Sequence, residues 1–546
     1  MQSQTNRREF LCAAAAALGA VGCQHLGAAA PSKPPFRVLY SNDTTNILTC
    51  TSPWHKAREE FRPEMLEATV DEVAGTGVDA HLLQPGVGWV PWWQSKVYPP
   101  AEHYRWIKEN YGLEPDTIGR YVRDGGDLVG LFIARCRKRG QAPFISLRLN
   151  DGHHKEWAPH KLGEKIGSGA SQGLCKFYCA HLDDYRIGPD WNDWSQRVQN
   201  WAIPEVRAYK FALLRELCEN YDLDGLELDF MRHYSFFQLD KTTVAERCAI
   251  IAAFVRDVRA LLDRTARGGR RRWLCARVPA FLPICDAIGV DVAALAAAGV
   301  DMFNVSASYF TFQQSDFAEL RRRAPQAAFY QEMCHSIWNG PKVRLGYDGF
   351  LFRRATPEQM QTTAHLAYAR GADGVSAFNF VYYREHGGKE RGPFQEPPFE
   401  VFKRLRDREW LARQPQQYFL STGFTCPYIK TKVLPKRLKT GQVAEFTLDL
   451  APPAGGWQRG GRLRVQGRES LGPSKFSAQL NGVELVATAD VAEHGAIFNP
   501  SLLGTPDQLR AWSIPPTTPR DGQNKLEIKL LAGTLADLAY LDLELA

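Results

Sequence analysis

Short apolar runs alternate with longer amphipathic stretches over residues 36–413. The runs are rich in branched and aromatic residues, as buried strands are, whereas the stretches between them carry apolar residues at helical spacing. The pattern predicts strands at 36–40, 78–83, 143–149, 225–230, 273–278, 301–306, 328–334 and 374–380. It predicts helices at 62–75, 118–139, 204–221, 242–266, 290–298, 315–323, 357–370 and 396–413.

Strand and helix follow each other eight times in this order. Several strands have the same approach, in which a glycine ends a helix and the strand begins at once, as at Gly77, Gly299 and Gly371. Such a series is typical of a parallel barrel. The sequence therefore predicts an α/β fold in which a (β/α)8 TIM barrel spans residues 31–415. Two long connections, 84–117 and 150–203, follow strand ends, where barrel active sites are built.

The pattern changes beyond residue 415. Residues 416–546 contain short alternating runs separated by turns rich in glycine and proline, without strong helical periodicity. Asn481-Gly482, between two such runs, is a hairpin signal. These features predict a C-terminal all-β sandwich that serves as an accessory domain.

Residues 1–30 have the features of an export signal. Arg7 and Arg8 precede Phe10 and an alanine-rich apolar stretch, a pattern similar to the twin-arginine signal. The stretch is shorter than the roughly 20 residues of a membrane-spanning helix. Cys23 offers a lipidation site (a lipobox), and cleavage near residues 28–30 is the alternative. We therefore expect twin-arginine export to a periplasmic, outer-membrane-anchored or secreted location.

Composition narrows the choice of partner. Apolar residues make up 44% of the chain and charged residues 23%, which is ordinary for a globular protein. The net charge of +7 comes from 67 basic and 60 acidic residues spread along the chain, which does not indicate a nucleic-acid binder. Aromatic residues reach 11%, and flat rings suit sugar stacking. We expect a carbohydrate partner, no nucleic acid, and membrane contact only through a lipid anchor; the oligomeric state is left open.

Three acidic residues fall on predicted barrel strands. Alternation places Glu227 and Asp229 on the face opposite to Leu226 and Leu228, and therefore inside the barrel. Glu332 takes an equivalent place in an otherwise apolar strand. Barrel interiors are normally filled by branched apolar residues, and acids there are costly unless they are paired or functional. We predict that these carboxylates act on a bound glycosidic bond, although Glu227 also suits a salt bridge to a barrel arginine.

Polar residues also follow the other strands, where they would line a pocket at one end of the barrel. The candidate substrate-binding residues are Arg148, Asn150, Asp151, His153, His154, Arg232, Arg277, Asn304, Tyr309, Asn379 and Tyr382. Trp89 and Trp92, in the connection after the second strand, are predicted to line sugar subsites.

Residues 36–412 resemble the bacterial family-10-like glycosyl hydrolases, a group near the clan of retaining (β/α)8-barrel glycosidases. The segments 148–154, 221–233 and 330–333 carry the resemblance. It implies an acid/base after the fourth strand and a nucleophile on the seventh, the place of Glu332. The Asn-Glu pair that usually ends the fourth strand is absent, which leaves the acid/base open between Asp229, Glu227 and Asp151.

The main hypothesis is an exported glycoside hydrolase, of the retaining kind, with Glu332 as nucleophile, Asp229 as acid/base and no cofactor or metal. One alternative is a non-catalytic carbohydrate-binding lipoprotein, which predicts acids that lie too far apart or are neutralised by arginine. The other is a metal-dependent hydrolase that uses His153, His154 and Asp151, which predicts a bound metal.

Overall fold

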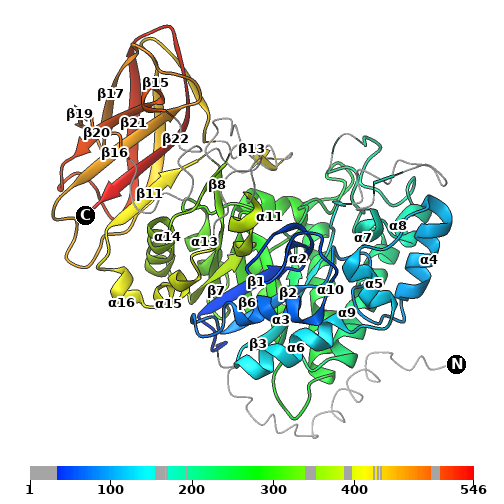
Figure 1. Cartoon of the computed structure of the whole chain (residues 1–546). Coiled ribbons are helices and arrows are strands. Elements are labelled where there is room, and N and C mark those ends of the chain that lie inside the picture. Colours follow the sequence, from blue (N-terminus) through cyan, green and yellow to red (C-terminus); the bar gives the residue numbers. More distant parts are fainter. Residues whose placement is uncertain are drawn as a thin grey trace, which may run out of the picture.

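The computed structural model describes residues 33–153, 166–167, 170–191, 193, 195–338, 352–386, 396–421, 425–426, 429–430, 433–492 and 505–546. The predicted export signal, Cys23 and His154 lie outside these residues. A barrel occupies one part of the molecule and a β-rich unit lies at its side (Figure 1). No helix among the described residues is both long and apolar enough to cross a membrane.

Eight parallel strands close into a barrel, which confirms the predicted fold class. The strands are β1 (Val38–Asp43), β2 (Ala80–Gln84), β3 (Ala142–Arg148), β4 (Gly225–Asp229), β5 (Trp273–Pro279), β6 (Met302–Ser306), β7 (Ala328–Cys334) and β10 (Gly374–Phe378). Each strand pairs with the next, and β10 pairs with β1 to close the ring. Every predicted strand is present, with bounds that shift by a few residues.

Helices surround the barrel and fill its connections. The main ones are α3 (Pro63–Asp71), α5 (Thr117–Arg123), α6 (Leu128–Arg139), α9 (Pro204–Asn220), α10 (Val244–Arg264), α11 (Leu282–Ile288), α12 (Val292–Ala297), α13 (Phe317–Arg323) and α14 (Pro357–Ala369). Shorter pieces are α2 (Thr45–Thr49), α4 (Pro100–Tyr111), α7 (Ala170–Gly173), α8 (Lys176–Ala180), η2 (Phe380–His386), η3 (Phe399–Val401), α15 (Phe402–Leu405) and α16 (Arg408–Leu411). A β8 (Ser336–Trp338) and β9 (Phe352–Arg354) hairpin follows β7.

Two predicted helices are wrong in extent. The one at 118–139 is divided into α5 and α6, because Gly125 adopts a left-handed φ of 99° and the side chain of Asp127 caps a new helix by accepting from Gly130. The one at 396–413 is three short pieces, the last of which is capped by Asp407. Helix α4, inside the long connection after β2, was not predicted.

The barrel interior has two layers of different polarity. The layer near the N-terminal ends of the strands is apolar and consists mainly of Phe36, Leu39, Ala80, Leu82, Phe144, Cys275, Met302, Ala328 and Tyr330. Toward the C-terminal ends, the buried residues in mutual contact are Asp43, Gln84, Ser146, Arg148, Glu227, Asp229, Arg277, Asn304, Ser306 and Glu332. Because polar groups are costly in a closed interior without partners, the second layer marks the C-terminal mouth as the place to look for function.

Residues beyond the barrel form two antiparallel sheets with an apolar core between them. One sheet contains β11 (Gln416–Leu420), β14 (Lys436–Lys439), β16 (Gly461–Gly467), β19 (Val486–Thr488), β20 (Leu509–Ile514) and β22 (Leu535–Leu545). The other contains β15 (Val443–Leu450), β17 (Lys475–Leu480), β18 (Val483–Glu484) and β21 (Gly522–Ala532). A separate pair, β12 (Thr425–Cys426) and β13 (Ile429–Lys430), lies between β11 and β14 in the chain.

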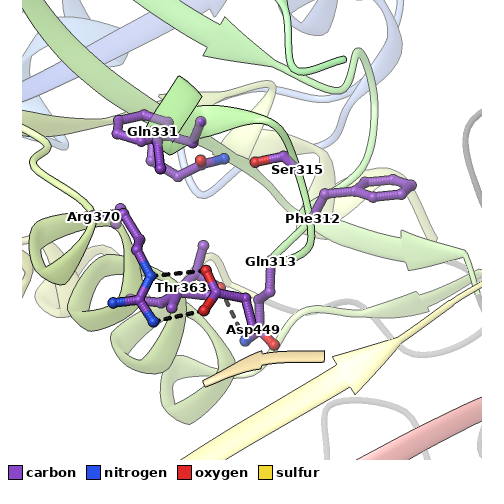
Figure 2. A pocket seen from close by; sticks show the side chains of 11 residues that line it. Phe312, Gln313, Ser315, Gln331, Thr363, Arg370 and Asp449 are labelled. Carbon is purple, nitrogen blue, oxygen red and sulfur yellow. Dashed lines mark hydrogen bonds and ion pairs between the residues drawn. The ribbon is translucent and has the colours of Figure 1, made fainter. Parts of the chain in front are cut away.

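The sandwich is attached to the barrel by polar contacts. The Gln313 side chain pairs with β11 as a strand would, because its amide donates to the Gln417 carbonyl at 3.1 Å and accepts from the Phe419 N–H at 2.8 Å. Arg370, at the end of α14, makes two hydrogen bonds of 2.6 and 2.8 Å to Asp449 (Figure 2). The small cavity of Figure 2 is lined by residues of these contacts and has a volume of about 20 Å³, which is room for little more than one water molecule.

Replacement of Arg370 by alanine should loosen the sandwich. The variant loses the paired hydrogen bonds to Asp449 and one of 2.7 Å to the Leu450 carbonyl, at side chains that are 19% and 20% exposed. We expect the free energy of unfolding to fall by about 1–2 kcal/mol, seen by calorimetry as a lower transition temperature. Arg413→Ala, at a side chain that is 66% exposed, is the control, and an equal shift in both variants would contradict the role of Arg370.

Candidate active site

An arginine connects two of the three predicted catalytic acids. Arg277 on β5 pairs in register with Asp229 on β4, and its Nη1 lies 3.1 and 3.2 Å from the two carboxylate oxygens. The other edge of the same guanidinium makes two hydrogen bonds of 2.7 Å to Glu332 on β7. Burial would lower the pKa of Arg277, but Asp229 and Glu332 raise it, so the guanidinium stays charged. The two acids therefore lie on opposite edges of one cation.

Neutral side chains complete the surroundings of Glu332. Ser306 donates to one carboxylate oxygen at 2.5 Å and Asn304 to the other at 3.1 Å. Burial raises the pKa of Glu332, and Arg277 and Ser306 oppose that shift. A carboxylate with this many donors is held in one orientation, as a nucleophile needs to be.

Glu227 lies deeper in the barrel and has a different environment. It accepts from Ser146 at 2.7 Å and from Asn304 at 3.1 Å, and no arginine bonds to it among the described residues. Burial and the neighbouring Asp229 raise its pKa to about 7. The salt bridge considered for Glu227 is therefore replaced by neutral donors, and the group can hold a proton near neutral pH.

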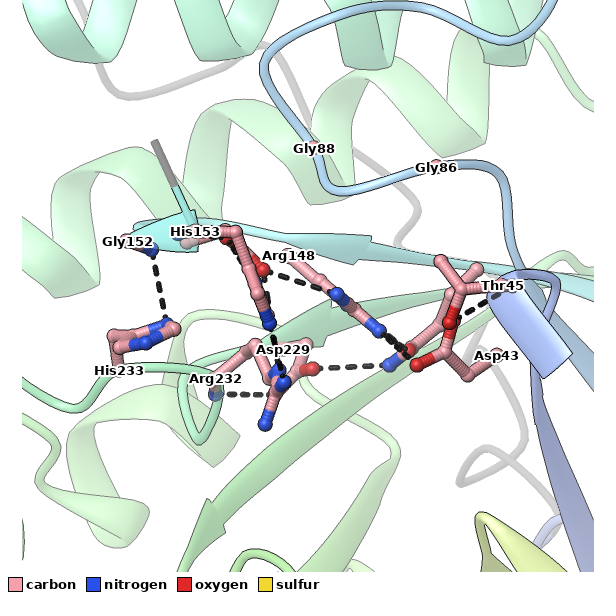
Figure 3. Close-up of polar contacts among 12 residues, drawn as sticks. Asp43, Thr45, Gly86, Gly88, Arg148, Gly152, His153, Asp229, Arg232 and His233 are labelled. Atoms are coloured by element: carbon pink, nitrogen blue, oxygen red, sulfur yellow. Dashed lines mark hydrogen bonds and ion pairs between the residues drawn. The ribbon is translucent and has the colours of Figure 1, made fainter. Parts of the chain in front are cut away.

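A second arginine joins the other side of the mouth. Arg148 on β3 lies 2.7 Å from Asp43 and 3.0 Å from Asp151 (Figure 3). It also donates to Gln84 at 2.8 Å, and Gln84 donates to Asp229 at 3.0 Å. Burial would raise the pKa of Asp43, yet Arg148 holds it below its usual value. One hydrogen-bond network thus runs from β1 to β7 across the mouth.

Above this network lies a partly exposed rim. His153, whose side chain is 38% exposed, bonds through Nδ1 to Asp151 at 2.7 Å and through Nε2 to Arg232 at 2.8 Å. Because a carboxylate only accepts and a guanidinium only donates, His153 is neutral, with its hydrogen on Nδ1. Partial burial lowers the pKa of His153, Asp151 opposes this, and Arg232 adds to it. The Arg232 guanidinium stacks on Tyr309, with 4.3 Å from its carbon to the ring centre.

Backbone strain gathers at the same end of the barrel. His233, Ser308 and Asn379 follow β4, β6 and β10 and have φ values of 60°, 66° and 50°. Residues other than glycine rarely adopt this left-handed backbone conformation, and those that do are often found at functional sites.

The contacts do not favour a metal site here. Asp151, His153 and His233 bring three possible ligand atoms within 4.8 Å of one another. Both ring nitrogens of His153 are engaged, however, and His233 Nδ1 accepts from the Gly152 N–H at 2.9 Å. The guanidinium of Arg232 beside His153 would also repel a cation. A metal would have to displace these partners, and the remaining predicted ligand, His154, lies outside the described residues.

Trp89 and Trp92 do not have the open position predicted for sugar subsites. Both are buried, with 0% and 1% exposed. The Trp89 ring stacks with Tyr209 and Phe177, and its N–H donates to the Asp151 carbonyl at 2.7 Å. The rings therefore support the connections around the mouth and present no face to a ligand.

Of three other predicted binding residues, Asn150 and Tyr382 have structural partners in the described part of the chain and Asn379 does not. Asn150 donates to the carbonyls of Gln199 and Ser235 at 2.8 and 2.6 Å, which ties together the connections after β3 and β4. The Tyr382 hydroxyl lies 2.9 Å from Thr45, which in turn bonds to Asp43. Asn379 is buried, and neither atom of its side-chain amide has a partner among the described residues.

Lys210 on α9 is a supporting residue that the sequence did not reveal. It is fully buried, hydrogen-bonds to the carbonyls of Gly88 and Arg148, and lies 3.5 Å above the Trp89 ring. Burial lowers its pKa to about 7. Gly88, with a φ of 88°, lets its backbone lie close to that of Arg148, so that Lys210 can reach both carbonyls; a Cβ there would lie 2.4 Å from the Arg148 carbonyl oxygen (Figure 3). A lone lysine in an amphipathic helix carries no signal of such a role.

Comparison with known proteins adds little to this geometry. No family model and no curated protein sequence matches the chain. Among solved structures, a GH138 enzyme targeting pectin rhamnogalacturonan II is similar at 12% identity and a TM-score of 0.40, over 69% of this chain and 48% of that one. Alpha-L-fucosidase isoenzyme 1 from Paenibacillus thiaminolyticus is similar at 13% identity and a TM-score of 0.34, over 90% and 96%. The chain thus spans about half the length of the first of these proteins. Structural similarity at these TM-scores does not indicate a function.

Removal of Arg277 should destabilise the barrel strongly. Arg277→Met leaves Asp229 and Glu332 buried without their cation, and breaking a buried pair costs about 3–5 kcal/mol. The loss should appear in urea unfolding at pH 7. Arg277→Met combined with Glu332→Gln removes one of the two stranded charges and should recover part of the loss. If the free energy of unfolding of Arg277→Met lies within about 1 kcal/mol of that of the unsubstituted protein, Arg277 does not neutralise Asp229 and Glu332 as described.

Glu227 should make stability depend on pH. Its pKa is about 7 in the folded protein against 4.5 ordinarily, so its contribution is complete below pH 4.5 and is lost as the pH rises through 7. Glu227→Gln removes this loss. From pH 5 to pH 8 the free energy of unfolding of the variant should rise by roughly 2–3 kcal/mol relative to the unsubstituted protein. Glu409→Gln, at a side chain that is 87% exposed, is the control, and parallel pH profiles for Glu227→Gln and the unsubstituted protein would contradict the assignment.

Proposed function

We propose that this protein is an exported glycoside hydrolase that cleaves a poly- or oligosaccharide at the C-terminal mouth of the barrel. The observation that carries the proposal is the excess of acid there. Five carboxyl groups, those of Asp43, Asp151, Glu227, Asp229 and Glu332, lie in the layer beneath the rim, against three guanidiniums, those of Arg148, Arg277 and Arg232. Glycoside cleavage passes through a cationic sugar, which a fixed excess of negative charge stabilises.

Glu332 is the proposed nucleophile. A nucleophilic carboxylate must be ionised and fixed in direction, and the two hydrogen bonds from Arg277 with the one from Ser306 serve both needs. As a Glu332 oxygen bonds to the anomeric carbon, the glycosidic C–O bond breaks and the leaving oxygen takes a proton from the acid/base. The negative charge of Glu332 is lost in this step, and Asp229, ionised once it has given its proton, neutralises Arg277.

Asp229 is the proposed second carboxylate. Its contacts restrict what it can do before a sugar binds, because Gln84, Arg277 and the backbone N–H groups of Met231 and Arg232 all donate to it. A protonated Asp229 would need an acceptor for its own hydrogen, and these four partners offer none. Acid/base action therefore requires that the bound sugar displace Gln84 or Arg277 from Asp229.

One observation favours a second function, that of a carbohydrate-binding protein without catalysis. Arg277 pairs with both proposed catalytic acids, and these are 0% and 2% exposed. A barrel that has lost catalysis has no need of free acids, and fold alone does not imply activity.

Incubation with algal and plant glycans, with the release of reducing ends as the measured signal, distinguishes the hydrolase from the binding protein. We expect turnover of at least one glycan, and Glu332→Gln should lower kcat by at least about 1,000-fold because the amide cannot form the glycosyl intermediate. Glu409→Gln is the matched control, and thermal unfolding checks that both variants fold. Undiminished turnover by Glu332→Gln would overturn its role as nucleophile. Saturable binding of a glycan without turnover would favour the second function.

A further inference from the structure

Arg232 differs from the other two arginines at the mouth. Arg148 and Arg277 each contact two carboxylates at 3.1 Å or less. The carboxylate oxygen nearest to Arg232 belongs to Asp151 and lies 3.9 Å from Nε. Asp151 is itself paired with Arg148 at 3.0 Å. Among the described residues, the one ion pair of Arg232 is therefore longer than any that Arg148 or Arg277 makes, and its carboxylate is shared with Arg148.

The guanidinium of Arg232 is nevertheless held in place. Its ring partner is Tyr309, and Nη2 donates to the neutral His153. The residue is 7% exposed, and Nε is buried without a hydrogen-bond partner. Figure 3 shows the side chain beneath His153, with a terminal nitrogen that makes none of the drawn contacts. A poorly solvated cation with donors left over is costly in the free protein, and that cost is relieved when an anion binds.

The position relative to the acids matters as much as the charge. The backbone N–H of Arg232 donates to Asp229 at 3.1 Å, so the rim cation is attached directly to the proposed catalytic strand end. A sugar whose anomeric carbon lies over the acidic layer would carry its ring substituents toward the rim. The planar fork of a guanidinium matches carboxylate and sulfate groups, which it binds with two hydrogen bonds.

We propose that Arg232 binds an oxyanion, a carboxylate or a sulfate, carried by the sugar that occupies the mouth. This inference rests on the proposed function in one respect, namely that the ligand is a saccharide. Tyr309 and His153 act as positioning residues, since one supports the face of the guanidinium and the other fixes its edge.

Calorimetric titration of the whole protein with sodium glucuronate, sodium sulfate and glucose tests the site without turnover. Glucuronate or sulfate should bind more tightly than glucose. Arg232→Gln should weaken that binding by about 10- to 100-fold, the effect of losing a hydrogen-bonded charge. Arg232→Lys keeps the charge but loses the planar fork, so its affinity for the anion should lie between those of the unsubstituted protein and Arg232→Gln. Arg270→Gln, at an exposed arginine paired with Asp222 before β5, is the control. Equal affinity for glucose and the two anions, or unchanged affinity in a folded Arg232→Gln variant, would overturn the proposal.

Hydrolysis of one acidic glycan in native, carboxyl-reduced and desulfated forms separates this inference from the proposed function. Loss of kcat/KM on carboxyl reduction alone identifies a uronate, and loss on desulfation alone identifies a sulfate ester. Equal hydrolysis of all three forms would contradict the anion site but support the proposed hydrolase function. Binding of glucuronate or sulfate that depends on Arg232, with no hydrolysis of any form, keeps the anion site and removes the hydrolase.

Discussion

The pairing of Arg277 with Asp229 and Glu332 is the interaction on which the mouth of the barrel depends. A closed barrel leaves little water in its interior, so each charge there needs a partner of opposite sign. Arg277 meets this need for two acids at once, and Arg148 does the same for Asp43 and Asp151. Gln84 joins the two groups through hydrogen bonds to Arg148 and Asp229. The upper half of the barrel is therefore a polar core.

This arrangement divides the acids by environment. Glu332 is surrounded by a cation and hydroxyl and amide donors, whereas Glu227 has only neutral partners and a pKa of about 7. The fixed and charged surroundings of Glu332 suit the proposed nucleophile, whereas Glu227 can hold a proton near neutral pH. At the rim the charge is positive, because Arg232 shares Asp151 with Arg148 and lies 3.9 Å from that carboxylate. An acidic sugar would meet a cation at its substituents and carboxylates at its anomeric carbon.

Sequence patterns predicted the structure best for the buried strands of the barrel. All eight barrel strands were predicted because each is an apolar run bounded by turn signals. The connections were harder, as helix α4 and the two short helices α5 and α6 show. Trp89 and Trp92 were predicted to face a sugar, but they pack inward, because a long connection needs a core of its own.

The sequence by itself determined the order of strands and helices, the change to an all-β unit, and the placement of Glu227, Asp229 and Glu332 inside the barrel. Alternation along one strand is a local property, and these conclusions need nothing more. Only the tertiary structure decided which charge meets which. Arg277 and Glu332 are 55 residues apart, and Gln84 and Asp229 are 145 apart. Neither contact leaves a trace in local periodicity, since it is the closing of the barrel that brings the strand ends together.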